Sequence, residues 1–202
     1  MQKRPSDVFT PRNPDVNEVM YVPRPFLEKA FRRAIESGKH VLVYGESGCG
    51  KSWLYKRTLY NDGAAMVVAN LANASRHESI VKEIETVTSE LLDPIRTVYT
   101  ESKSAEASAF GFAKGSLEHE STYQLPQGDP LERCFSALRR AAGEKTCCLV
   151  LDNLETIFSN ERLMSELGEI VVLLDDARYA RHRIKLVIVG VPGGVREYFW
   201  LS

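Results

Sequence analysis

Three glycines, a lysine and two serines fall within one eight-residue stretch of the 202-residue chain, Gly45-Glu46-Ser47-Gly48-Cys49-Gly50-Lys51-Ser52. Glycine tolerates backbone conformations that turn several N–H groups toward one side, and such a turn binds anions. A helix that begins at Lys51 would direct the positive end of its dipole to the same place. In this pattern the lysine reaches the β- and γ-phosphates and the Ser52 hydroxyl binds Mg²⁺. The stretch predicts a site for ATP with Mg²⁺, which also includes the next residue, Trp53; the alternative is a glycine-rich turn without a ligand.

A second set of polar residues follows an apolar run, in Leu149-Val150-Leu151-Asp152-Asn153-Leu154-Glu155. Asp152 stands at the carboxyl end of the expected strand, where open α/β sheets bind their ligands. We expect this carboxylate to hold Mg²⁺ through water. Phosphoryl transfer also needs a group that orients or deprotonates the attacking water. Glu155 is the candidate for this base, and the alternative is that it complements the dipole at a helix start.

The remaining pattern predicts the elements that position these residues. Continuous apolar runs indicate buried strands at residues 40–44, 64–69, 147–151 and 186–189. Amphipathic stretches indicate helices from Pro25 to Gly38, over 52–59, from a Ser75–Glu78 capping box to Pro94, from Asp129-Pro130, and around 163–174. We expect the first helix to bury Phe26, Leu27, Ala30, Phe31, Ala34 and Ile35. Strands that alternate with helices predict an α/β fold of three layers around a parallel sheet. We assign residues 1–24 to an N-terminal linker, residues 25–202 to the core, and residues 100–127 to a surface insertion.

These motifs resemble the AAA+ and STAND branches of the P-loop ATPases. The resemblance rests on the glycine loop between a strand and a helix, on the strand that ends at Asp152, and on the later Val189-Gly190-Val191-Pro192. It implies that Tyr21 and Val22 contact adenine. For Arg24, in the same segment, we expect a structural ion pair. The resemblance also implies that Arg196 occupies the region of an arginine finger.

Two features depart from this family pattern. The fourth strand of the family ends in a polar sensor residue, whereas this chain has Gly190, which either leaves room for a water or leaves sensing to another residue. The chain also stops at Ser202, before the fifth strand and the helical lid of the family. We therefore expect an N-terminal ATPase core from a longer protein, without its C-terminal lid.

Charge and composition narrow the functional classes. The formal net charge of −1 indicates no global attraction to nucleic acid, and the apolar runs are too short to span a membrane. The basic residues Arg178, Arg181, His182, Arg183 and Lys185 either complement a helix end or contact nucleic acid or a neighbouring nucleotide site. No CxxC pair is present, so Cys134, Cys147 and Cys148 are expected to be small buried residues of a reduced, cytoplasmic protein. Cys49 is expected to be a small residue at a position that tolerates many residue types; the alternative is a redox switch.

Three functional hypotheses remain. The first is a regulatory ATPase that couples nucleotide state to homo-oligomerisation or to signalling through further domains or an effector, as in bacterial defence. The second is a DNA-associated AAA+ ATPase of replication or transposition, and the third is a nucleotide-binding scaffold with little turnover. A GTPase is disfavoured because the chain has no Asn-Lys-x-Asp element.

Overall fold

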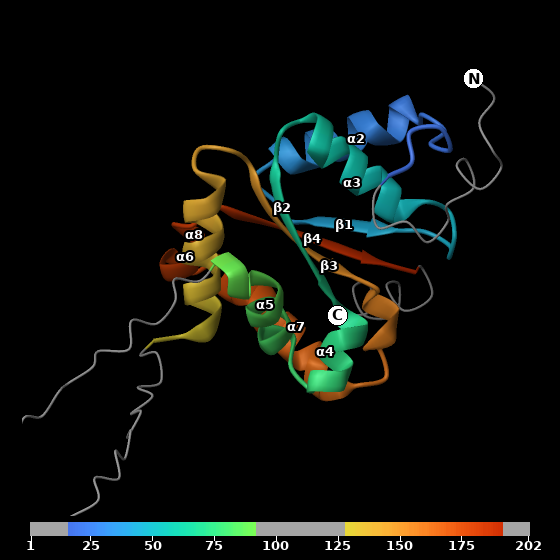
Figure 1. Cartoon of the computed structure of the whole chain (residues 1–202). Coiled ribbons are helices and arrows are strands. Elements are labelled where there is room, and N and C mark those ends of the chain that lie inside the picture. Colours follow the sequence, from blue (N-terminus) through green and yellow to red (C-terminus); the bar gives the residue numbers. More distant parts are fainter. Residues whose placement is uncertain (1–15, 92–127, 192–202) are drawn as a thin grey trace, which may run out of the picture.

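A computed structural model of the chain describes residues 16–91 and 128–191. Four strands in these ranges form one sheet in the order β1-β4-β3-β2, and every neighbouring pair is parallel. They are β1 (Val41–Tyr44), β2 (Ala65–Asn70), β3 (Cys147–Asp152) and β4 (Ile184–Gly190). All four arrowheads in Figure 1 therefore end at the same side of the sheet. This confirms the predicted parallel α/β fold.

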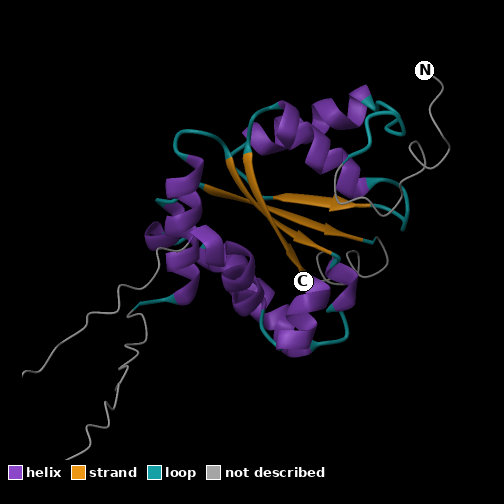
Figure 2. Ribbon diagram, in the orientation of Figure 1, coloured by secondary structure: helices purple, strands orange, loops and turns teal. Residues whose placement is uncertain are grey.

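Helices cover both faces of the sheet and complete three layers (Figure 2). On one face lie α2 (Pro25–Glu36) and α3 (Lys51–Asn61). On the other face lie α4 (Leu71–His77), α5 (Ile80–Thr88), α6 (Pro130–Ala142), α7 (Glu161–Leu173) and α8 (Ala177–Ala180). Two short 3₁₀ turns, η1 (Ser89–Leu91) and η2 (Leu154–Thr156), follow α5 and β3.

The central strands β3 and β4 supply side chains to both hydrophobic cores. Along β3, Cys147, Leu149 and Leu151 pack toward α4–α8, whereas Cys148 and Val150 pack toward α2 and α3. This alternation follows from the two-residue repeat of a strand. Burial raises the pKa of the Cys148 thiol to about 12, so the group stays neutral, as expected of a small core residue.

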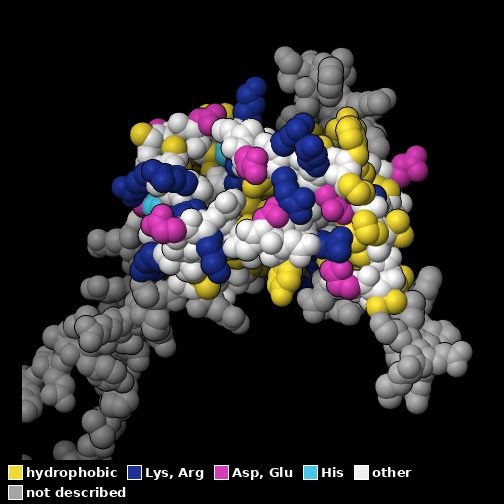
Figure 3. Space-filling view, turned by 90° about the horizontal axis from the view of Figure 1, so that it is seen from above, with side chains coloured by type: hydrophobic (Ala, Val, Ile, Leu, Met, Phe, Trp, Pro, Cys, Tyr) yellow, Lys and Arg dark blue, Asp and Glu magenta, His cyan; other side chains and the backbone are white. Residues whose placement is uncertain are grey.

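Two predictions about buried strands and helix faces are wrong in part. The strand β1 lies at the edge of the sheet, so only Val41 is buried and Tyr44 is 55% exposed. In α2 Phe31 is buried, but Phe26 is 82% and Leu27 44% exposed. Hydrophobic side chains are accordingly visible on the surface of this layer, seen from above in Figure 3.

The long helix predicted from a Ser75 cap is instead two helices. Asn70 caps α4 by accepting from Ala72 N, and Glu78 then leaves the helix at φ 55°. The second helix, α5, has Ser79 as its cap. Ser79 Oγ donates to Glu166 Oε1, and the backbone N–H groups of Ile80 and Val81 donate to the same carboxylate. A side chain 87 positions away along the sequence thus helps to begin this helix, and periodicity gives no sign of it.

The predicted helix start at Asp129-Pro130 is confirmed. The Asp129 carboxylate accepts from Leu131 N, Pro130 is the first helical residue, and Leu131, Phe135 and Leu138 are buried. None of the helices in residues 16–91 and 128–191 combines the length and apolar character that crossing a membrane requires. The predicted insertion at 100–127, Arg196 and the chain end lie outside the described residues.

Candidate functional site

The glycine loop connects the carboxyl end of β1 with the first turn of α3. Gly48 and Gly50 have φ angles of 78° and 81°, in the left-handed region that favours glycine. Gly50 is the N-cap of α3, so the loop ends where the free N–H groups of the helix begin. A Cβ added to Gly45 would stand 2.9 Å from Cys49 Sγ, and one at Gly48 would meet nothing within 4 Å. The loop is therefore tight at its start and open at its exposed tip.

The Lys51 side chain folds back over the loop. Its Nζ donates to the carbonyl oxygens of Gly45 at 2.8 Å and of Glu46 at 2.9 Å. Both acceptors are neutral, and a phosphate oxygen would be a stronger partner because it carries a negative charge opposite to that of the ammonium. The ammonium group is thus held against the start of the glycine loop.

Asp152 meets the first turn of α3 at the end of β3. Its Oδ2 accepts from Ser52 Oγ at 3.2 Å and from Tyr55 OH at 2.9 Å, and its Oδ1 accepts from Asn153 N at 2.9 Å. The structure thus brings together the two predicted Mg²⁺-binding residues. A hydroxyl and a carboxylate are hard oxygen ligands of the kind that Mg²⁺ prefers, so the residues present fit the ion.

Tyr55 is a site residue that sequence reasoning missed. Burial, together with the Asp152 carboxylate, raises the pKa of its phenol far above the usual value, so the group remains a hydrogen-bond donor. Tyr55 follows Ser52 by three positions, and residues at this spacing share one face of a helix. The three-residue spacing from Ser52 is therefore the sequence signal by which Tyr55 could have been predicted as a site residue.

The chain turns sharply after Asp152. Asn153 has φ 65°, and its Nδ2 donates to Asn70 Oδ1 at 2.9 Å. The next residue, Leu154, is fully buried, and Glu155 is exposed on η2. Within the part of the chain that the structure describes, no hydrogen bond engages the Glu155 carboxylate. Asn153 therefore has a structural partner, whereas the Glu155 carboxylate has no hydrogen-bond partner among the described residues.

Gly190, at the predicted sensor position, is required for packing. Its carbonyl accepts from Gly45 N at 3.3 Å, which joins the end of β4 to the start of the glycine loop. A Cβ built on Gly190 would stand 2.9 Å from Leu154 Cβ and 3.6 Å from Glu155 Oε2. The Leu154 side chain, rather than empty space for a water, lies against this glycine, and Glu155 lies near the same strand end.

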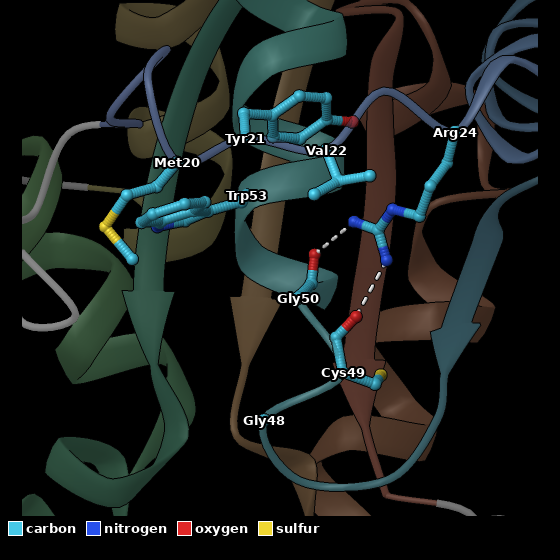
Figure 4. Close-up of a pocket in the computed structure, with 8 residues that line it drawn as sticks. All are labelled: Met20, Tyr21, Val22, Arg24, Gly48, Cys49, Gly50 and Trp53. Atoms are coloured by element: carbon cyan, nitrogen blue, oxygen red, sulfur yellow. Dashed lines mark hydrogen bonds between the residues drawn. The ribbon is translucent and has the colours of Figure 1, made fainter. Parts of the chain in front are cut away.

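The segment that precedes α2 forms one wall of a pocket of about 340 Å³ beside the loop. Figure 4 shows Met20 and Trp53 side by side, with Val22 above Gly50. Tyr21 and Val22, predicted to contact adenine, differ in exposure: Val22 is 73% exposed, whereas Tyr21 is 7% exposed. Tyr21 OH donates to Glu28 Oε1 at 2.7 Å, and the Arg57 guanidinium lies 4.2 Å from the Tyr21 ring centre. The Tyr21 side chain thus supports the wall of the pocket.

Arg24 has a different role from the ion pair that was expected. Its Nη1 donates to Cys49 O at 2.7 Å and its Nη2 donates to Gly50 O at 2.8 Å. Both acceptors are backbone carbonyls of the glycine loop, so Arg24 belongs to the structure of the loop itself.

The basic residues near β4 are engaged elsewhere in the molecule. Arg178, Arg181 and His182 lie within ion-pair distance of the Glu132 carboxylate, and Arg181, followed by His182, lowers the pKa of Glu132. The Lys185 ammonium donates to the carbonyls of Ser37 and Lys39. These four side chains all have intramolecular partners at the end of the sheet opposite the glycine loop.

Comparison with known proteins agrees with this site. A family model described as an AAA domain matches residues 33–199, a range that contains the glycine loop, Asp152, Glu155 and Gly190. Tyr21, Val22 and Arg24 precede the matched range. No curated protein matches the chain. The match spans well over half of the sequence, and with the parallel sheet it shows that the chain belongs to the AAA domain family of P-loop nucleotide-binding proteins.

Proposed function

We propose that this protein binds ATP with Mg²⁺, hydrolyses it, and couples its nucleotide state to homo-oligomerisation or to signalling. The hydrogen bond between Ser52 and Asp152 carries the proposal. This bond brings a hydroxyl from α3 and a carboxylate from β3 together at the carboxyl ends of the strands, where parallel α/β folds bind their ligands.

Each polar group has a distinct part in this proposal. Lys51 and the N–H groups at the start of α3 bind phosphate oxygens, and Ser52 and Asp152 hold the metal. When bound, Mg²⁺ supplies positive charge that offsets the charge developing on the phosphates. Asn153, an amide, has no carboxylate with which to accept a proton. Glu155 is therefore the base that orients or deprotonates the attacking water.

Binding is tested by titrating wild type and Lys51→Ala with ATP and Mg²⁺ in a calorimeter. We expect Lys51→Ala to lose most of the affinity, because the strongest phosphate donor of the loop is gone. Lys29→Ala, which removes an exposed lysine of α2, is the matched control. Equal affinities for all three proteins would refute the proposed site.

Turnover is tested by comparing phosphate release by wild type and Glu155→Gln. A general base typically contributes about 10²–10⁴-fold to the rate, and we expect a loss in that range with little change in ATP affinity. Glu144→Gln, another exposed carboxylate, is the control. Near-background rates in all three would favour a nucleotide-binding scaffold.

Coupling to assembly is tested by light scattering of wild type and Glu155→Gln with and without ATP and Mg²⁺. We expect a larger mass for the ATP-bound form of Glu155→Gln, in which slow turnover preserves ATP. A mass unchanged by nucleotide would leave ATP binding intact but contradict coupling to oligomerisation.

A further inference from the structure

The Arg24 guanidinium spans two consecutive peptide groups at the point where the glycine loop enters α3. Its two terminal nitrogens donate separately to Cys49 O and Gly50 O, as the dashed lines in Figure 4 show. The guanidinium also packs closely against the loop, since a Cβ on Gly50 would stand 3.1 Å from Arg24 Nη2. The contact is thus a close fit between a rigid planar cation and a glycine backbone.

These two hydrogen bonds also help to orient two N–H groups. The peptide between Gly50 and Lys51 is held in addition by the helical bond from Leu54 N to Gly50 O at 3.0 Å, whereas the peptide between Cys49 and Gly50 precedes the helix. A trans peptide is planar, so its N–H points away from its C=O. The peptides whose carbonyls face Arg24 carry the N–H groups of Gly50 and Lys51. Both N–H groups consequently point to the side opposite Arg24. We propose that Arg24 is a positioning residue that holds these two peptides ready for phosphate, an inference that rests on the proposed nucleotide site.

Arg24 is itself anchored by residues outside the loop. Glu28 Oε1 accepts from Arg24 N at 3.0 Å and from Tyr21 OH at 2.7 Å, and these two bonds lower the pKa of Glu28. Arg57 of α3 lies over the Tyr21 ring and pairs with Glu18 and Glu28. The Arg24 side chain thereby connects the chain segment before α2 to the glycine loop. Phosphate affinity depends on how this segment packs against α3.

The test compares wild type with Arg24→Gln in binding to ATP and to inorganic tripolyphosphate, which carries no base. We expect Arg24→Gln to weaken both ligands by about tenfold or more. Arg24→Lys, whose ammonium can reach one of the carbonyls, is expected to recover part of this loss. Arg32→Gln, which removes an α2 arginine paired with Asp62, is expected to change neither ligand.

A second variant separates positioning from folding. Glu28→Gln keeps Arg24 but weakens its anchor, and we expect a smaller loss of tripolyphosphate affinity in a protein with a wild-type circular dichroism spectrum. The inference would be overturned if Arg24→Gln is folded and binds tripolyphosphate as tightly as wild type does. A loss of ATP affinity alone would not rescue the inference, because Arg24 would then act on the base and not on the phosphates. Wild-type protein that binds neither ligand would instead overturn the proposed function.

Discussion

The Ser52 hydroxyl lies 3.2 Å from the Asp152 carboxylate, although 100 positions separate the two residues in the sequence. Ser52 belongs to the first turn of α3, and Asp152 is the last residue of β3. The strand β4 lies between β1, which leads into the loop, and β3. The proposed metal-binding pair is therefore assembled across the sheet.

Replacing Asp152 with Asn should abolish most of the effect of Mg²⁺ on ATP affinity. The carboxamide oxygen can still accept from Ser52 and Tyr55 but not also from Asn153 N, and the negative charge proposed to hold the cation is lost. A circular dichroism spectrum like that of wild type establishes that the variant is folded. The measurement is ATP titration with Mg²⁺ and with a chelator. Asp62→Asn, at a surface ion pair with Arg32, serves as the control, and an unchanged Mg²⁺ dependence in Asp152→Asn would contradict the assignment.

Replacing Gly190 with Ala should destabilise the protein and impair turnover. The added methyl group would stand 2.9 Å from Leu154 Cβ, and inserting a methyl group into a packed core costs about 1–3 kcal/mol. Relief of this clash would move η2 and, with it, Glu155. Urea unfolding and phosphate release measure the two effects.

Gly168→Ala is the matched control for Gly190→Ala. Gly168 lies within α7, and a Cβ there would meet nothing within 4 Å. Because alanine is favoured over glycine in a helix interior, this variant should gain roughly 0.5–1 kcal/mol. Equal unfolding midpoints for the two variants would contradict the packing argument.

Replacing Glu166 with Ala should destabilise the protein through the start of α5. The carboxylate accepts from Ser79 Oγ, Ile80 N and Val81 N, and removing a charged partner from such donors costs about 1–3 kcal/mol. Glu169→Ala, an exposed position on the same helix, should have little effect. The urea concentration at the unfolding midpoint is measured for both variants. If Glu166→Ala unfolds at as high a urea concentration as Glu169→Ala, Glu166 does not stabilise the helix start.

The free energy of unfolding should depend on the protonation of His40 in mildly acidic solution. His40 Nδ1 accepts from Leu186 N, an interaction that requires an unprotonated Nδ1. Burial lowers the pKa of His40 below its ordinary value of 6.5, with Lys185 lowering it further and Asp175 opposing the change. The unfolded chain therefore binds more protons than the folded protein just below pH 6.5. The stabilising contribution is complete above that pH and is lost as the pH falls toward the folded-state pKa.

The measurement is the free energy of unfolding of wild type and His40→Gln between neutral and mildly acidic pH. We expect the difference between the two proteins to shrink as the pH falls, because the variant has no imidazole to protonate. Parallel curves for the two proteins would contradict a role for His40 ionisation.

Local patterns predicted most of the secondary structure. The helix start at Asp129-Pro130 was predictable because a cap depends on residues one to three positions apart. The break between α4 and α5 was not, since Glu78 adopts a left-handed conformation that its residue type does not indicate. The edge position of β1 could not be predicted from the hydrophobic pattern either. An apolar run shows that a strand can be buried, but it does not show which strands lie beside it.

By itself, the sequence determined the glycine loop, the Lys51-Ser52 pair and the acidic end of β3, because each depends on residue types at short, constant spacing. Only the tertiary structure decided which distant groups meet: Ser52 with Asp152, Arg24 with Cys49 and Gly50, and Leu154 with Gly190. The physical reason is that these contacts depend on strand order and on how the segment before α2 packs against α3. A parallel sheet assembles its site from chain segments far apart in the sequence, and no local periodicity encodes their pairing.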